Sequence, residues 1–132
     1  MSFDVFIQTT DKNYSFSRSI VEEAFRPYSG SFSADRMQRL SFPGGGSSDL
    51  YVSQKPMING FSVMAAGGDA LYDAIYQVLR RVPHLYMYWS GGSVVADPAV
   101  ILELPEGLIE AFGPPSVVRS GQDIIEAIER GP

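Results

Sequence analysis

Short segments in which apolar and polar residues alternate constrain the fold of this 132-residue chain more than any other feature. In residues 85–89, Leu85, Met87 and Trp89 alternate with Tyr86 and Tyr88, which is the period of a β-strand. The same alternation marks four further segments, at residues 3–8, 38–42, 49–53 and 58–65. Glycine- or proline-containing turns separate most of these segments, so we predict a mostly antiparallel sheet.

Helical periods occur between these strands. The clearest one places Leu71, Ile75, Val78 and Leu79 on one stripe, and Pro83 ends it. Asp69 is predicted to cap this helix. An earlier helix is predicted to start at a Ser19–Glu22 capping box and to end at Pro27. We also predict two short helices between residues 98 and 113, the first capped by Asp97, and a last helix capped by residues 120–123. With two further short strands expected at residues 94–96 and 116–119, the resulting order is βαβββαββααβα. It indicates an α+β fold of five to seven short strands, with helices mainly on one face, in a single domain over residues 1–132.

The charge of the chain is uneven. Fifteen acidic side chains oppose ten basic ones, giving a net charge of −5. Residues 97–132 hold seven acidic residues and two arginines, so they account for the whole excess. This balance argues against a protein that binds the phosphate backbone of nucleic acid. We expect Glu103, Glu106 and Glu110 to share one helical face, which is either a binding surface for a basic protein or the solvated side of a core-packed helix.

The residue inventory excludes several chemistries. The chain has no cysteine, which rules out disulfides, thiolate metal sites and cysteine nucleophiles. It has one histidine, and neither an EF-hand calcium loop nor a phosphate-binding loop occurs, so we expect no metal and no cofactor. No signal-peptide pattern and no long apolar run is present, so we expect a cytoplasmic protein that does not span a membrane.

One catalytic arrangement stays open. His84 is the only histidine and could act as a general base near Asp49 or Asp97. A small hydrolase or transferase would then use Asp49, Tyr51 and His84 in one cleft. The alternative is that His84 lies at the surface where a strand begins.

The outward face of the predicted sheet is rich in tyrosine. If the other face packs on the helices, this face carries nine residues: Phe6, Gln8, Arg39, Ser41, Asp49, Tyr51, Ser62, Tyr86 and Tyr88. Arginine and tyrosine anchor many interfaces, so Arg39, Tyr51, Tyr86 and Tyr88 are candidate partner contacts. An ordinary exposed antiparallel face has a similar composition. A homodimer that buries this face or an edge strand is a further alternative.

Three stretches, residues 1–8, 45–51 and 94–98, resemble a group of small uncharacterised bacterial α+β proteins. That resemblance implies a fold but no activity and no site residue. The size, the acidity and the lack of cysteine also resemble the immunity proteins that neutralise bacterial toxins. With so few reactive side chains, the leading hypothesis is a non-enzymatic protein that binds another macromolecule.

Overall fold

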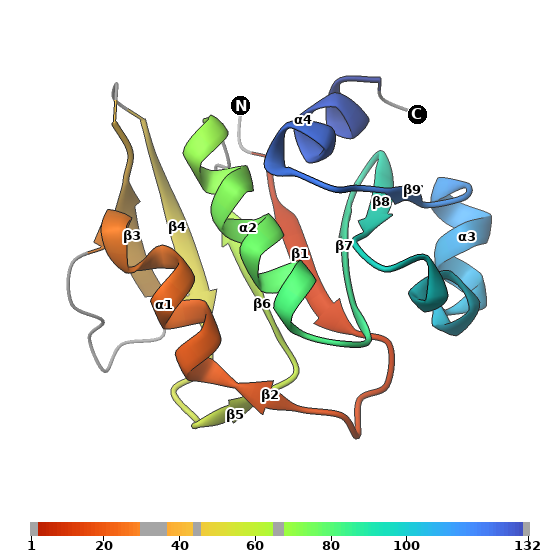
Figure 1. Ribbon diagram of the computed structural model, residues 1–132, viewed down its shortest axis with the longest axis horizontal. Coiled ribbons are helices and arrows are strands. Elements are labelled where there is room, and N and C mark those ends of the chain that lie inside the picture. The colour runs from red at the N-terminus through yellow and green to blue at the C-terminus, as the bar shows by residue number, and fades with distance from the viewer. Residues whose placement is uncertain (1–2, 30–36, 44–45, 65–67, 131–132) are drawn as a thin grey trace.

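The computed structural model describes residues 3–29, 37–43, 46–64 and 68–130. Its main sheet has seven strands in the order β3-β4-β6-β1-β7-β8-β9 (Figure 1). These strands are β1 (Val5–Thr9), β3 (Met37–Ser41), β4 (Ser47–Val52), β6 (Gly60–Met64), β7 (Leu85–Trp89), β8 (Gly92–Val95) and β9 (Ser116–Val117). All neighbouring pairs are antiparallel except β8 and β9, which are parallel. Two short strands, β2 (Phe16–Ser17) and β5 (Met57–Ile58), form a separate small sheet.

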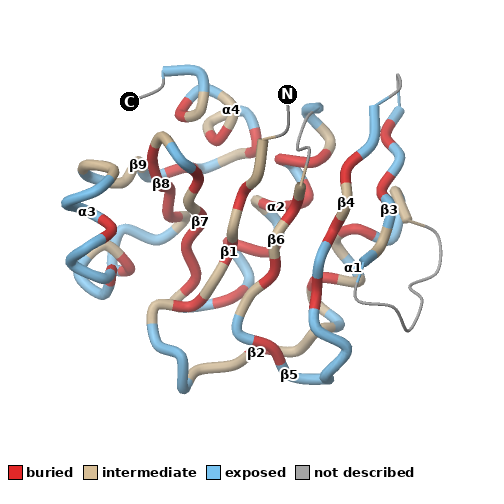
Figure 2. Tube along the Cα trace, turned by 180° about the vertical axis from the view of Figure 1, so that it is seen from behind, coloured by how far each residue is buried: buried red, intermediate tan, exposed pale blue. Residues whose placement is uncertain are grey.

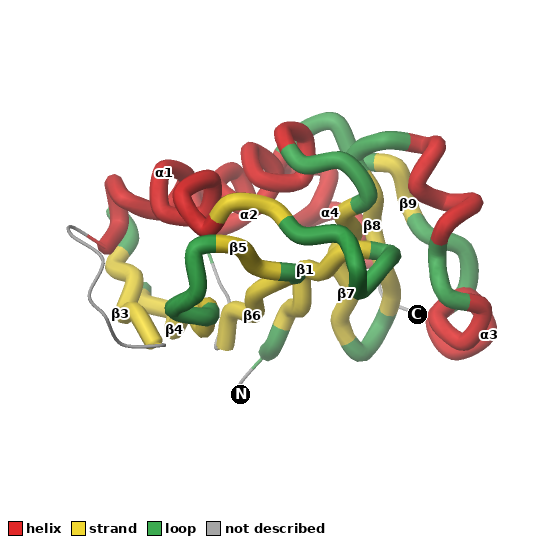
Figure 3. The backbone as a smooth tube through the Cα atoms, turned by 90° about the horizontal axis from the view of Figure 1, so that it is seen from below, coloured by secondary structure: helices red, strands yellow, loops and turns green. Residues whose placement is uncertain are grey.

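Three helices cover one face of the main sheet, as Figure 3 shows. They are α1 (Arg18–Ser29), α2 (Asp69–Arg81) and α4 (Gly121–Arg130). Their apolar sides meet the inward residues of the sheet in one large core that includes Phe25, Ile75, Ile124, Ile7 and Val63. The α+β class and the mostly antiparallel sheet predicted from the alternation are therefore confirmed.

A second, smaller core lies on the opposite face. The 3₁₀ helix η1 (Pro98–Glu103) and α3 (Glu106–Phe112) follow β8. They contribute Val100, Leu104 and Leu108, which pack with Tyr86 and Val95 of the sheet. As a result β7 and β8 are buried along nearly their whole length, as Figure 2 shows. The described parts of the other strands have no such cover on this face.

The strand register confirms the predicted assignment of faces. Phe6 lies opposite both Ser62 and Tyr88, and Tyr51 lies opposite Ser62. These residues therefore share one face, while their neighbours along each strand enter the large core.

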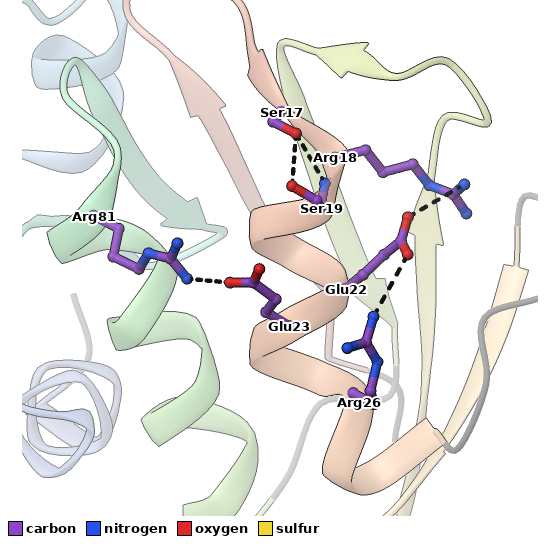
Figure 4. Close-up of polar contacts among 7 residues, drawn as sticks. All are labelled: Ser17, Arg18, Ser19, Glu22, Glu23, Arg26 and Arg81. Atoms are coloured by element: carbon purple, nitrogen blue, oxygen red, sulfur yellow. Dashed lines mark hydrogen bonds and ion pairs between the residues drawn. The ribbon is translucent and has the colours of Figure 1, made fainter.

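The start of α1 differs from the prediction. Ser17 rather than Ser19 provides the capping oxygen, because the Ser19 amide donates to Ser17 Oγ at 3.3 Å (Figure 4). Glu22 does not close a capping box; its carboxylate pairs with Arg18 at 3.6 Å and Arg26 at 4.0 Å. The helix also continues past Pro27 to Ser29. Pro27 lacks the amide hydrogen that would bond the Glu23 carbonyl, but its fixed φ of about −65° is helical, so the helix continues for two more residues.

Two other boundaries were wrong. Gly68, not Asp69, is the N-cap of α2, and Asp69 is already within the first turn. The single strand expected at residues 58–65 divides at Asn59, and residue 65 lies outside the described residues. The Asn59 side chain donates to the carbonyls of Lys12 and Tyr14, which holds the chain where β5 leaves one sheet and β6 enters the other.

Within the described ranges, every helix is too short or too polar to cross a membrane.

Candidate functional site

The outer surface of η1 and α3 is acidic and carries exposed apolar side chains. Asp97 caps η1 as predicted, with its Oδ1 accepting the Ala99 amide at 3.0 Å. The inward residues belong to the second core, so the remaining side chains face solvent. Leu102 is 93% exposed, and Ile109 is exposed beside Glu106 and Glu110. We call the exposed side chains of η1 and α3, which include Leu102, Glu106, Ile109 and Glu110, the η1–α3 surface.

The expectation that three glutamates share one helical face was wrong. η1 ends at Glu103 and α3 begins at Glu106, with Leu104 and Pro105 between them. Only Glu106 and Glu110, one turn apart, lie on one face of α3, together with Ile109. Proline after Leu104 has no amide hydrogen to donate and disfavours helical geometry in the residue before it, which separates the two helices.

Glu103 instead faces the only histidine. Glu103 Oε1 lies 2.7 Å from His84 Nδ1 and accepts the Thr10 hydroxyl at 2.9 Å. The hydrogen bond with His84 lowers the pKa of the Glu103 carboxyl, and the Thr10 hydroxyl contributes in the same direction. The Tyr14 ring meets the His84 ring edge-on at a centroid distance of 5.0 Å. These contacts connect the end of η1 to the segments after β1 and before β7.

A hollow of about 290 Å³ lies over this cluster, lined by Thr10, Asp11, Tyr14, His84 and Glu103. His84 has a φ of 64°, which is unusual for a residue with a side chain. Its backbone is held there because the Thr10 amide donates to the His84 carbonyl at 2.8 Å. Strained residues of this kind often occur at functional sites, so the hollow is a second candidate site.

The chemistry open to this hollow is narrow. A carboxylate on Nδ1 orients an imidazole for acid–base work through its other nitrogen. However, the Thr10 hydroxyl donates to the same Glu103 oxygen that faces His84, so it is not placed to give its proton to the ring. The His84 and Glu103 side chains are 44% and 36% exposed, so water screens their electrostatic interaction. The arrangement supports at most activation of a water molecule.

Among the described residues, His84 pairs with Glu103 and not with Asp97, and it lies away from Asp49 and Tyr51. Asp49 and Tyr51 lie on β4, and β6 and β1 separate that strand from β7. At roughly 4.8 Å per strand, this places them about 14 Å away across the sheet. Asp49 is paired with Arg39 at 2.6 Å on the open face. The three residues proposed for one cleft therefore lie at two separate places.

The tyrosine row is divided in the same way. Tyr86 is 1% exposed beneath η1 and α3, where its hydroxyl accepts Gln8 Nε2 at 2.6 Å and burial raises the pKa of the phenol. Tyr88 is half-buried and stacks between Phe6 and Phe112, at centroid distances of 5.1 and 6.2 Å. Tyr86 cannot reach a partner without displacement of these helices. Of the four candidate contacts on the sheet, Arg39 and Tyr51 remain exposed.

Comparison with known proteins gives no match to this chain among protein-family models, curated proteins or solved structures. The resemblances noted from the sequence therefore stay predictions.

Proposed function

We propose that this chain is a non-enzymatic binding protein whose η1–α3 surface binds a basic protein partner. One observation carries the proposal: Leu102 is 93% exposed within a segment whose charges are all negative. Residues 97–112 contain Asp97, Glu103, Glu106 and Glu110 and neither lysine nor arginine. Surrounding an apolar anchor with charge of one sign is typical of interfaces that attract a partner electrostatically and then exclude water from the anchor.

The surface is held in place before any partner arrives. Val100, Leu104 and Leu108 fix η1 and α3 on the sheet, and the Glu103–His84 contact holds the end of η1. A preorganised surface loses less conformational entropy on binding than a mobile one. Among basic partners, a toxin neutralised by this chain is the version implied by the immunity-protein resemblance.

A photo-crosslinking amino acid at position 102 tests this proposal in native-host cells. We expect it to capture a defined protein that the same group at Gln77, an exposed position on α2, does not capture. The captured protein is then purified, and its affinity for the unmodified chain is measured at increasing salt. Affinity should fall with salt because exposed charges are screened.

Charge reversal supplies the matched control. The double variant Glu106→Lys/Glu110→Lys should weaken binding at least about tenfold, a loss of about 1.4 kcal/mol. Glu126→Lys/Glu129→Lys on α4 changes the net charge equally at another place and should have a much smaller effect. Equal losses in the two double variants would show that only net charge matters, and no loss in either would remove the η1–α3 surface as the binding site.

A second candidate, a small hydrolase, is favoured by the 2.7 Å contact between His84 Nδ1 and Glu103 Oε1 beside the hollow. In this function His84 takes a proton from water that attacks the substrate, and Glu103 orients the ring. A panel of activated esters and phosphate esters tests it. Turnover that is lost in both His84→Gln and Glu103→Gln but kept in Asp49→Asn would support the hydrolase, and no turnover above buffer would reject it for these substrates.

A further inference from the structure

A row of residues on the open face of the main sheet is aromatic except at one strand. Phe6 of β1 lies opposite Tyr88 of β7 on one side and opposite Ser62 of β6 on the other. Tyr51 of β4 in turn lies opposite Ser62. The four strands run side by side across the sheet, as Figure 2 shows. The small hydroxyl side chain of Ser62 therefore leaves a gap in the row between Phe6 and Tyr51.

A hollow of about 260 Å³ lies over this gap. We call it the Ser62 hollow; Phe6, Gln8, Tyr51 and Ser62 are the residues of the open face that line it. Neighbouring strands are roughly 4.8 Å apart, so β1 and β4, on either side of β6, are about 10 Å apart. The rings of Phe6 and Tyr88, on adjacent strands, stack at a centroid distance of 5.1 Å. Two such intervals span the gap, so its width matches one inserted ring.

The orientation of the Phe6 ring also suits a further ring. The Phe6 and Tyr88 rings are 21° from parallel, and Phe112 stacks on Tyr88 at 6.2 Å and 23°. Tyr88 covers the β7 side of the Phe6 ring, so the other face of that ring is turned toward β6 and the Ser62 hollow. The stack of three rings therefore ends at the hollow, where the open face of Phe6 is available to another aromatic ring.

The polar groups of the hollow favour a neutral ligand with a hydrogen-bond donor. Of the described residues that line it, none is charged. A charged group would lose water there without meeting an opposite charge. Gln8 Nε2 donates to the Tyr86 hydroxyl at 2.6 Å, whereas Gln8 Oε1 has no partner among the described residues and can accept a hydrogen bond.

We propose that the Ser62 hollow binds a small, neutral, planar aromatic molecule whose ring lies over Ser62 between Phe6 and Tyr51. A hydroxyl or N–H group on the ring donates to Gln8 Oε1. The volume corresponds to about nine water molecules at roughly 30 Å³ each, which restricts the ligand to one or two rings. The hollow shares no residue with the η1–α3 surface, so this site is independent of the proposed partner-binding function.

Titration of the ¹⁵N-labelled full chain, followed by NMR, tests the site. Phenol is the probe, cyclohexanol is the ring of the same size and hydroxyl that is not planar, and benzoate is the charged aromatic ring. We expect phenol to bind saturably, in the millimolar range given its few atoms, and to shift the amide signals of Phe6, Tyr51 and Ser62 but not that of Leu102. Cyclohexanol and benzoate should each bind at least about fivefold more weakly.

Variants of the two walls and of the gap separate stacking from general apolar binding. Tyr51→Leu should weaken phenol binding about fivefold, whereas Tyr51→Phe keeps the ring and should bind phenol within about twofold of the unmodified chain. Ser62→Phe places a ring of the chain itself in the gap and should abolish binding. This variant should stay folded, because aromatic pairs on neighbouring strands stabilise a sheet, and its urea midpoint checks this.

Several results would overturn the proposal. These are the absence of saturable shifts, equal affinity for phenol and cyclohexanol, or unchanged phenol affinity in Tyr51→Leu or in a folded Ser62→Phe. A capped tyrosine, N-acetyltyrosinamide, that bound at least about tenfold more tightly than phenol would assign the gap to an aromatic side chain of a protein partner and would also overturn it. The crosslinking test at position 102 does not use this hollow, so such results would leave the η1–α3 surface untouched.

Discussion

Replacement of Gly121 by alanine should push α4 away from α2. Gly121 is the first residue of α4 and is buried against the backbone of Asp73 on α2. A Cβ at this position would lie 2.6 Å from the Asp73 amide nitrogen and 2.8 Å from its Cα, whereas ordinary contact begins at 3.4 Å. The helices must therefore separate by up to about 0.8 Å at this crossing, because backbone atoms cannot rotate out of the way.

The cost follows from what this separation loosens. Ile124 and Ala127 of α4 belong to the large core, so a shift of the helix disturbs their packing. Overpacking of this kind costs about 1–3 kcal/mol. Gly107 in α3 is the matched control, since an added Cβ there meets nothing within 4 Å. Alanine at position 107 should stabilise the protein by about 0.5–1 kcal/mol, because glycine is a poor helix former.

Urea unfolding followed by circular dichroism measures both variants under the same conditions. The midpoint should fall in Gly121→Ala and rise in Gly107→Ala, with the same dependence on urea as in the unmodified chain. If Gly121→Ala were as stable as the unmodified chain, the close approach of α4 to α2 would not exist as described. A similar loss in both variants would mean that glycine is needed for a reason other than space.

Three further predictions concern the two sheet faces and the His84 cluster. Gly60→Ala should lower the free energy of unfolding by about 1–3 kcal/mol in the same assay. The added Cβ would lie 2.9 Å from Gln8 Cα, and closer still to the Ile7 carbonyl oxygen, at the centre of the sheet. An unchanged urea midpoint would contradict this prediction. Tyr86→Phe should cost about 1 kcal/mol, since the Gln8 amide loses its 2.6 Å partner in a partly buried place, and a neutral result would mean that water replaces it. The pKa of Glu103 is lower in the folded state than in the unfolded state. Its carboxylate therefore stabilises the fold above its ordinary pKa, and this stabilisation is lost as the pH falls through the pKa of the folded state. Glu103→Gln should therefore be less stable than the unmodified chain at pH 7, by under about 1 kcal/mol because the Glu103–His84 pair is exposed. Between pH 5 and pH 3 this variant should lose less stability than the unmodified chain. Parallel profiles of stability against pH in the two proteins would disprove the contribution of Glu103.

The parts of the fold that the sequence predicts are those fixed by neighbours along the chain. Strand alternation and the Asp97 cap each depend on residues a few positions apart. The division at Asn59 of the strand predicted at residues 58–65 does not. It depends on bonds from that side chain to carbonyls 47 and 45 residues earlier. No local period carries that information.

The sites were harder to predict for the same reason. The carboxylate that faces His84 belongs to Glu103, 19 residues later, and the pair forms only because η1 returns toward the start of β7. The burial of Tyr86 has a weak signal in the sequence. Val100, Leu104 and Leu108 recur every four residues, and such a stripe requires a second apolar surface to cover it. That surface is the part of the outward sheet face that was predicted to be open.

The second core supports the proposed binding surface on η1 and α3. It fixes the helices that present Leu102, Glu106 and Glu110, and Phe112 at the end of α3 stacks on Tyr88. A small apolar cluster on the outer face of the sheet adds little to the large core, yet without it η1 and α3 would have no apolar surface to pack against. Its position therefore makes physical sense if the outer sides of these helices, rather than the sheet beneath them, are where the chain meets other molecules.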